Sequence, residues 1–165
     1  MRPTPSGYWH LDEMVIVIRG CRHWLWCAVD NEGKVLDFLV QSKRNARAAL
    51  KLLRKLLKKP GWAPTRITTD RLRPYHAAIR TLGLTAEHID NKRANNRAEN
   101  SHQSFRRPER KQQRFKSLGS AQRILNIQSA VYNTFYVQRH LLDRSTFKRF
   151  RTDAFNVWDC ASAAA

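Results

Sequence analysis

Three β-prone runs near the start of the chain most constrain how it can fold. Residues 14–18, MVIVI, form an uninterrupted apolar run, which predicts a strand buried on both faces. Residues 23–29 and 34–41 are two further runs rich in aromatic and β-branched side chains. Between them, DNEG at residues 30–33 is typical of a hairpin turn. We therefore expect the chain to begin with three antiparallel strands.

After residue 41 the spacing of apolar residues predicts helices that alternate with short strands. Residues 45–59 place their apolar side chains on one helical face, and Pro60 and Gly61 end the pattern. The next expected elements are a strand at residues 66–69, a helix at 75–82 and a strand at 86–89. The residue pattern alone therefore predicts a mixed α/β protein that begins with a meander.

A last helix is expected at residues 120–140. Its apolar side is predicted to pack on the sheet and consists of Ile124, Ile127, Val131 and Phe135.

One carboxylate stands in the most basic part of the chain. Residues 92–116 contain nine Lys or Arg and only two Glu. If residues 98–107 are helical, Glu99 shares a face with His102 and Arg106. An acid in this position could simply offset neighbouring arginines, or it could hold a divalent metal against a phosphate.

Asp12 and Asp70 are the candidate partners of Glu99. Asp12 comes directly before the run at residues 14–18, and Asp70 closes the fourth strand. Carboxylates at strand ends and on a following helix can converge at one sheet edge, and oxygen ligands of this kind suit Mg²⁺ or Mn²⁺. The plainer alternatives are a turn residue or cap for Asp12 and a helix N-cap for Asp70. Glu13 would point to the opposite face of the strand from Asp12, and we interpret it as structural.

Several separate motifs resemble, in order, the catalytic domain of bacterial insertion-sequence transposases. They are WHLDE at residues 9–13, VLDFLVQS at 35–42, ITTD at 67–70, NNRAENSH at 95–102, RRPER at 106–110 and QRFKS at 113–117. The likeness is to the insertion-sequence six group of DDE transposases and covers residues 9 to about 149. It implies an α/β, ribonuclease-H-like fold of the retroviral integrase superfamily, with a mixed five-stranded sheet flanked by helices. Asp12, Asp70 and Glu99 match the Asp-Asp-Glu triad of that family.

The resemblance also implies two-metal chemistry on DNA. The triad would hold two Mg²⁺ or Mn²⁺ ions for strand cleavage at transposon ends and strand transfer into target DNA, performed by a homo-oligomer on DNA. His102, one turn after Glu99, would position a phosphate or else pack locally. The expected DNA-binding residues are His102, Arg106, Arg107, Arg110, Lys111, Arg114 and Lys116.

Two features depart from the family, and two other functions stay open. Only 28 residues separate Asp70 from Glu99, fewer than is usual in the family. The family also carries an N-terminal helix-turn-helix segment, whereas this chain starts shortly before Asp12. The chain could therefore be a truncated, inactive remnant that acts only as a basic nucleic-acid-binding protein. It could also be another ribonuclease-H-like nuclease, such as a junction resolvase.

Charge and composition agree with a nucleic-acid partner. A net charge of +18 attracts polyanions, and no run approaches the length of a membrane span, so no membrane partner is expected. Three cysteines without metal-binding spacing fit a reducing cytoplasm, here that of a bacterium, with the protein at the nucleoid. We expect a linker at residues 1–8, the DDE catalytic domain at 9–150 and a C-terminal tail at 151–165.

Overall fold

The computed structural model describes residues 5–59, 61–91, 115–135 and 143–163. A mixed five-stranded sheet in the order β3-β2-β1-β4-β5 confirms the predicted architecture. The strands are β1 (Tyr8–Ile18), β2 (Cys21–Asp30), β3 (Val35–Gln41), β4 (Arg66–Thr69) and β5 (Glu87–Asp90). The helices are α1 (Ala46–Leu57), α2 (Arg73–Leu82), α4 (Leu118–Phe135) and α5 (Arg144–Ala163).

The first three strands form the predicted antiparallel meander. β1 pairs with β2 along nearly its whole length, and β2 pairs with β3. The turn between β2 and β3 is fixed by Asp30, whose carboxylate accepts hydrogen bonds from the backbone N–H groups of Glu32 and Lys34, both at 2.9 Å. Gly33 adopts a φ of +81°, a left-handed conformation that a side chain would strain.

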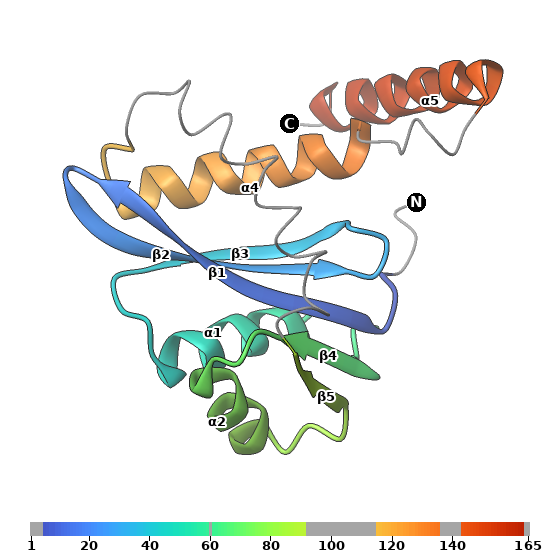
Figure 1. The fold of residues 1–165 in the computed structure, drawn as a ribbon. Helices are drawn as coiled ribbons and strands as arrows, with labels where there is room; N and C mark the ends of the chain where they lie inside the picture. Colours follow the sequence, from blue (N-terminus) through green and yellow to red (C-terminus); the bar gives the residue numbers. More distant parts are fainter. Residues whose placement is uncertain (1–4, 60, 92–114, 136–142, 164–165) are drawn as a thin grey trace.

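Helices cover both faces of the sheet, with α1 and α2 on one face and α4 on the other (Figure 1). Leu52, Leu53 and Leu56 of α1 are fully buried in the core on the first face, together with Trp26. The side chain of Asn45 caps α1 by accepting a hydrogen bond from the Ala48 N–H at 3.1 Å. The sheet is thus the middle layer of three.

Two predictions about apolar faces are wrong. Val15 and Val17 of the MVIVI run are 41% and 47% exposed, because this end of β1 buries only alternate residues against the α4 side. In α4, Ile124 packs against the sheet core as predicted, but Ile127 and Val131 are 60% and 38% exposed, while Ala121 and Leu125 are buried.

The rotation of α4 relative to the prediction has a polar cause. Gln122 accepts a hydrogen bond from the Val40 N–H and donates to the Phe38 carbonyl, both at 2.9 Å. Asn133 makes the equivalent pair with the backbone of Val35, at 2.9 and 2.7 Å. These amides satisfy the backbone groups on the outer edge of β3, so the side of α4 that faces the sheet is chosen partly by hydrogen bonds rather than by apolar periodicity.

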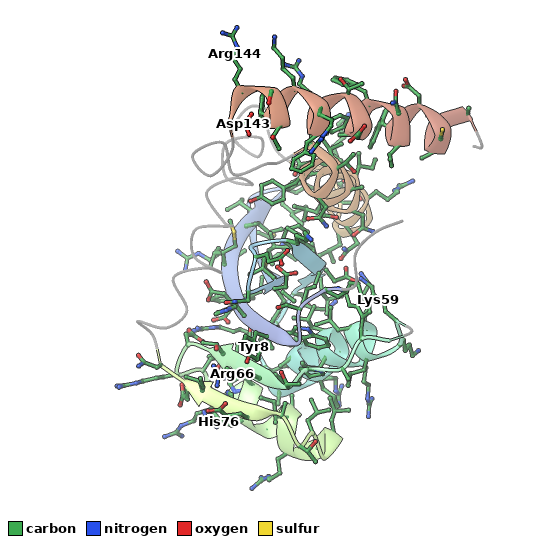
Figure 2. The ribbon with its side chains drawn as sticks, turned by 90° about the vertical axis from the view of Figure 1, so that its right-hand side faces the viewer. Tyr8, Lys59, Arg66, His76, Asp143 and Arg144 are labelled. Atoms are coloured by element: carbon green, nitrogen blue, oxygen red, sulfur yellow. The ribbon has the colours of Figure 1, made fainter. Side chains whose placement is uncertain are left out.

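α5 lies beyond α4, at the opposite end of the molecule from α2. Figure 2 shows Asp143 and Arg144 at the start of α5, far from His76 of α2. Phe155 and Trp158 of α5 contact the Phe135 ring of α4, with centroids 5.1 and 5.7 Å apart. The helix runs across residue 150, where the sequence suggested a C-terminal tail. Within the described residues, no helix combines the length and apolar character needed to cross a membrane.

Leu53→Ala should lower the free energy of unfolding by about 2–5 kcal/mol, because it opens a cavity in the core under α1. Lys51→Ala, on the exposed face of the same helix, should change it by less than about 0.5 kcal/mol. Urea unfolding followed by circular dichroism measures both. A loss of similar size in the two variants would show that α1 is not packed through this face.

Candidate active site

The parallel pairing of β1 with β4 brings together two of the predicted carboxylates. The register runs from Tyr8 opposite Arg66 to Leu11 opposite Thr69, so Asp12 and Asp70 are the next residues of each chain segment. Asp12 lies inside β1 and not before it, which corrects the prediction that it precedes the first strand. The strand is longer than its apolar run because Trp9 and Leu11 are also buried in the sheet.

Asp12, Asp70 and also Glu13 form a cluster of carboxylates. One oxygen from each residue lies within 4.8 Å of the other two. Asp70 also accepts a hydrogen bond from the Leu72 N–H at 3.3 Å, so it fixes the turn before α2 without being the helix N-cap, which is Leu72. The predicted convergence of Asp12 and Asp70 is therefore confirmed.

None of the other predicted catalytic and DNA-binding residues can be placed in this cluster from the described residues. Glu99, His102, Arg106, Arg107, Arg110, Lys111 and Arg114 lie outside the described residues. Lys116 is exposed and follows Phe115, which forms a bridge to Ile18 at the far end of β1. Since Ile18 is six residues beyond Asp12, Lys116 lies about 20 Å along the strand from the carboxylates.

The reading of Glu13 as merely structural needs correction. Its side chain is only 1% exposed, and its Oε1 accepts hydrogen bonds from Nε of Arg44, at 2.9 Å, and from Nη2 of the same guanidinium. Burial raises the pKa of Glu13, as does the charge of Asp70, while the hydrogen bonds from Arg44 oppose the rise. Glu13 reaches the cluster because β4 ends at Thr69, which leaves the edge of β1 open beside residues 12 and 13.

Tyr75 of α2 closes the buried side of the cluster. Its ring packs edge-on against Trp26, with centroids 5.4 Å apart. Burial raises the pKa of Tyr75 well above its usual value, and the negative charges of Glu13, Asp12 and Asp70 add to this. The Tyr75 hydroxyl and Oε2 of Glu13 are both buried, and apart from each other neither has a hydrogen-bond partner among the described residues.

This arrangement fits a divalent cation. All its donors are carboxylate oxygens, the ligands that Mg²⁺ and Mn²⁺ prefer, and they come from two neighbouring strands whose pairing fixes their spacing. Arg44 supplies a counter-charge, with Nη2 at 4.0 Å from Oδ2 of Asp70. Oε2 of Glu13 is buried and makes no ion pair to any described residue, so a bound cation would offset its charge.

A basic surface follows the exposed side of α1. Arg47, Lys51, Arg54 and Lys58 are exposed at i, i+4, i+7 and i+11, which puts them on one helical face. None of the four makes an ion pair within the part of the chain that the structure describes. With Leu39, Leu50 and Lys55 they line a surface hollow. We call these four residues the α1 basic face; it is a surface suited to phosphates.

The fold belongs to the ribonuclease-H-like class of the retroviral integrases. The HTLV-2 integrase catalytic core domain, solved in complex with magnesium in a trimeric form, superposes with a TM-score of 0.61 at 14% identity, over 86% of this chain and 92% of that one. The catalytic core domain of BIV integrase gives a TM-score of 0.55 at 18% identity, over 80% of this chain and 86% of that one.

The sequence narrows the class to a family. Residues 6–138 match the family model described as the DDE domain, so the chain belongs to the DDE-domain family of bacterial insertion-sequence transposases. Two similar relatives, both from Staphylococcus aureus, are the transposase for insertion sequence-like element IS431mec and that of IS257 in transposon Tn4003. Each is 27% identical over an alignment of 139 positions that covers 81% of this chain. The chain spans 60% of the length of each of these relatives.

Mg²⁺ should stabilise the folded chain through this cluster. At a concentration tenfold above its dissociation constant, binding contributes about 1.4 kcal/mol, which raises Tm by about 3–6 °C. Asp70→Asn should lose most of this rise because it removes one ligand charge, whereas Asp153→Asn, on an exposed position of α5, should keep it. Calorimetry with Mg²⁺ and with EDTA measures the difference; an undiminished rise in Asp70→Asn would place the metal elsewhere.

Proposed function

We propose that this chain is the catalytic domain of a DNA transposase that cleaves transposon ends and transfers them into target DNA. The convergence of Asp12 and Asp70 on adjacent parallel strands carries this proposal. Membership of the DDE-domain family supports it, as does the integrase-like fold. Glu99, from the basic segment, is proposed as the third member of the triad.

Asp12, Asp70 and Glu99 would hold two Mg²⁺ or Mn²⁺ ions. When bound, such a pair supplies activation of a water or of a DNA 3′-hydroxyl and stabilisation of the leaving oxygen. The protein contributes rigidity, because Asp12 is fixed by pairing with Cys27 of β2 and Asp70 by its turn hydrogen bond to Leu72. The three negative charges would offset part of the charge of the ions. Because the attacking group would be water or a DNA hydroxyl, the chain would need no covalent intermediate.

DNA is the proposed substrate and partner. The α1 basic face supplies four cations that make no ion pair to any described residue, and the proposed DNA contacts also include His102, Arg106, Arg107, Arg110, Lys111, Arg114 and Lys116. These groups suit phosphates rather than base edges, so the isolated chain should bind DNA without sequence preference. The working form is proposed to be a homo-oligomer on DNA, at the nucleoid in the bacterial cytoplasm.

The decisive experiment compares Mg²⁺-dependent nicking of a duplex by the parent chain and by Asp70→Asn. The variant should lose nicking to below detection while binding the duplex with equal or slightly higher affinity, because a ligand charge is lost and the basic surface remains. Asp153→Asn is the matched control and should nick like the parent.

The same assay separates the alternatives. Binding without nicking in the parent would indicate a remnant that acts only as a nucleic-acid-binding protein. Nicking without joining of a 3′-hydroxyl end to a second duplex would indicate another ribonuclease-H-like nuclease, such as a junction resolvase. Equal nicking by parent and Asp70→Asn would remove Asp70 from the active site.

Removing cations from the α1 basic face should weaken DNA binding through counterion release. Lys51→Ala combined with Arg54→Ala should reduce the slope of log K against log salt by about two units, and by the same amount for any duplex sequence. Arg80→Ala, an exposed cation in the last turn of α2, should leave the slope unchanged. Fluorescence anisotropy of a labelled duplex at salt concentrations between about 50 and 200 mM measures the slope. An unchanged slope in the double variant would exclude this face from the DNA interface.

A further inference from the structure

Arg44 lies beside the carboxylate cluster and contacts it directly. It lies in the segment between β3 and α1, and its guanidinium reaches across to β1 and to the residue after β4. Nε and Nη2 both donate to Oε1 of Glu13, and Nη2 lies 4.0 Å from Oδ2 of Asp70. Arg44 therefore contacts the edge of the cluster. It is not one of the residues of the α1 basic face.

Two contacts, with Glu13 and with Trp24, hold this guanidinium in one orientation. One edge is fixed by Glu13, which cannot move away because its side chain is almost fully buried. The flat face lies over the Trp24 ring, with the guanidinium carbon 4.9 Å from the ring centroid. Trp24 itself packs against the core on the α1 side of the sheet. An arginine on an exposed helix face has no such restraint.

The restrained guanidinium keeps donors available. Arginine has five N–H groups, and the hydrogen bonds to Glu13 use two of them. The other three make no hydrogen bond to any described residue, and the side chain is 39% exposed. The structure thus presents an oriented, partly solvent-facing donor edge next to the oxygens of Asp70.

We propose that Arg44 is a phosphate-binding residue of the active site, and that Glu13 and Trp24 are the positioning residues that aim its free donors at the phosphate. The inference rests on the proposed function, since it needs a phosphate brought to this cluster. A guanidinium suits the task because its planar fork can bond a carboxylate with one edge and a phosphate oxygen with another. If Arg44 only formed an ion pair with Glu13, its three remaining N–H groups would have no function at the site.

The test is the gain in DNA affinity that Mg²⁺ produces, measured by anisotropy of one labelled duplex in Mg²⁺ and in EDTA. Arg44→Ala should lose about tenfold in affinity in Mg²⁺ and less than about twofold in EDTA, because its hydrogen bond forms only when the phosphate sits at the loaded cluster. Arg47→Ala, one turn away on the α1 basic face, should lose the same factor under both conditions.

Two further variants guard the interpretation. Arg44→Lys keeps the charge, but a lysine cannot bond Glu13 with one edge and a phosphate with another. This variant should therefore lose most of the Mg²⁺-dependent gain in DNA affinity, even if Arg44→Ala folds poorly. Glu13→Ala should lose the gain too, and combining it with Arg44→Ala should cost no more than either alone, because the two side chains act as one unit.

The outcomes separate this inference from the function on which it rests. Equal losses by Arg44→Ala in Mg²⁺ and EDTA, in a parent chain that nicks DNA, would overturn the inference and leave the proposed function intact. The same holds if Glu13→Ala removes the gain while Arg44→Ala preserves it, which would make Glu13 a metal ligand. A parent chain with neither a Mg²⁺-dependent gain nor nicking would overturn both.

Discussion

The parallel register between β1 and β4 is the constraint on which the candidate active site depends. Pairing of Leu11 with Thr69 places Asp12 and Asp70 at the same level of the sheet, although 57 residues separate them in the chain. In the same register β4 ends beside the middle of β1. The edge of β1 is therefore unpaired next to Glu13, and the Glu13 side chain can approach Asp12 and Asp70 there. Slipping β1 by one residue would reverse which side chains face the core and would separate the two aspartates.

Bringing three carboxylates together is unfavourable, and the surrounding structure is arranged to offset it. Arg44 supplies the nearest positive charge, and its place is tied to that of α1, which begins two residues later. α1 is in turn fixed to β3 by the buried carboxylate of Asp37, which pairs with Lys55 at 2.7 Å and Lys59 at 3.0 Å. One helix therefore serves two purposes: its inner face builds the core, and its outer face carries cations that make no ion pair to any described residue.

Much of the fold and part of the site could be predicted from the sequence. The meander, the four-residue strand Arg66–Thr69 and the helix ending at Gly83 follow from local pattern and turn residues, because each is decided within a few positions. Asp12 and Asp70 could be identified because the motifs around them resemble a known family in the same order. Glu99 and most of the basic residues near it lie outside the described residues, and their place at the site stays a prediction.

The sequence alone determined the order and type of the elements and the chemical kind of the site, since side-chain period and carboxylate chemistry are local properties. Only the tertiary structure decided which residues meet. Alternation along a strand placed Glu13 away from Asp12, but it could not show that the neighbouring strand stops at Thr69. Apolar spacing identified Ile124 but not the rest of the sheet-facing side of α4, because Gln122 and Asn133 bond to the edge of β3. Arg44 looked like any other cation until Glu13 and Trp24 fixed it, since orientation comes from neighbours that are distant in the chain.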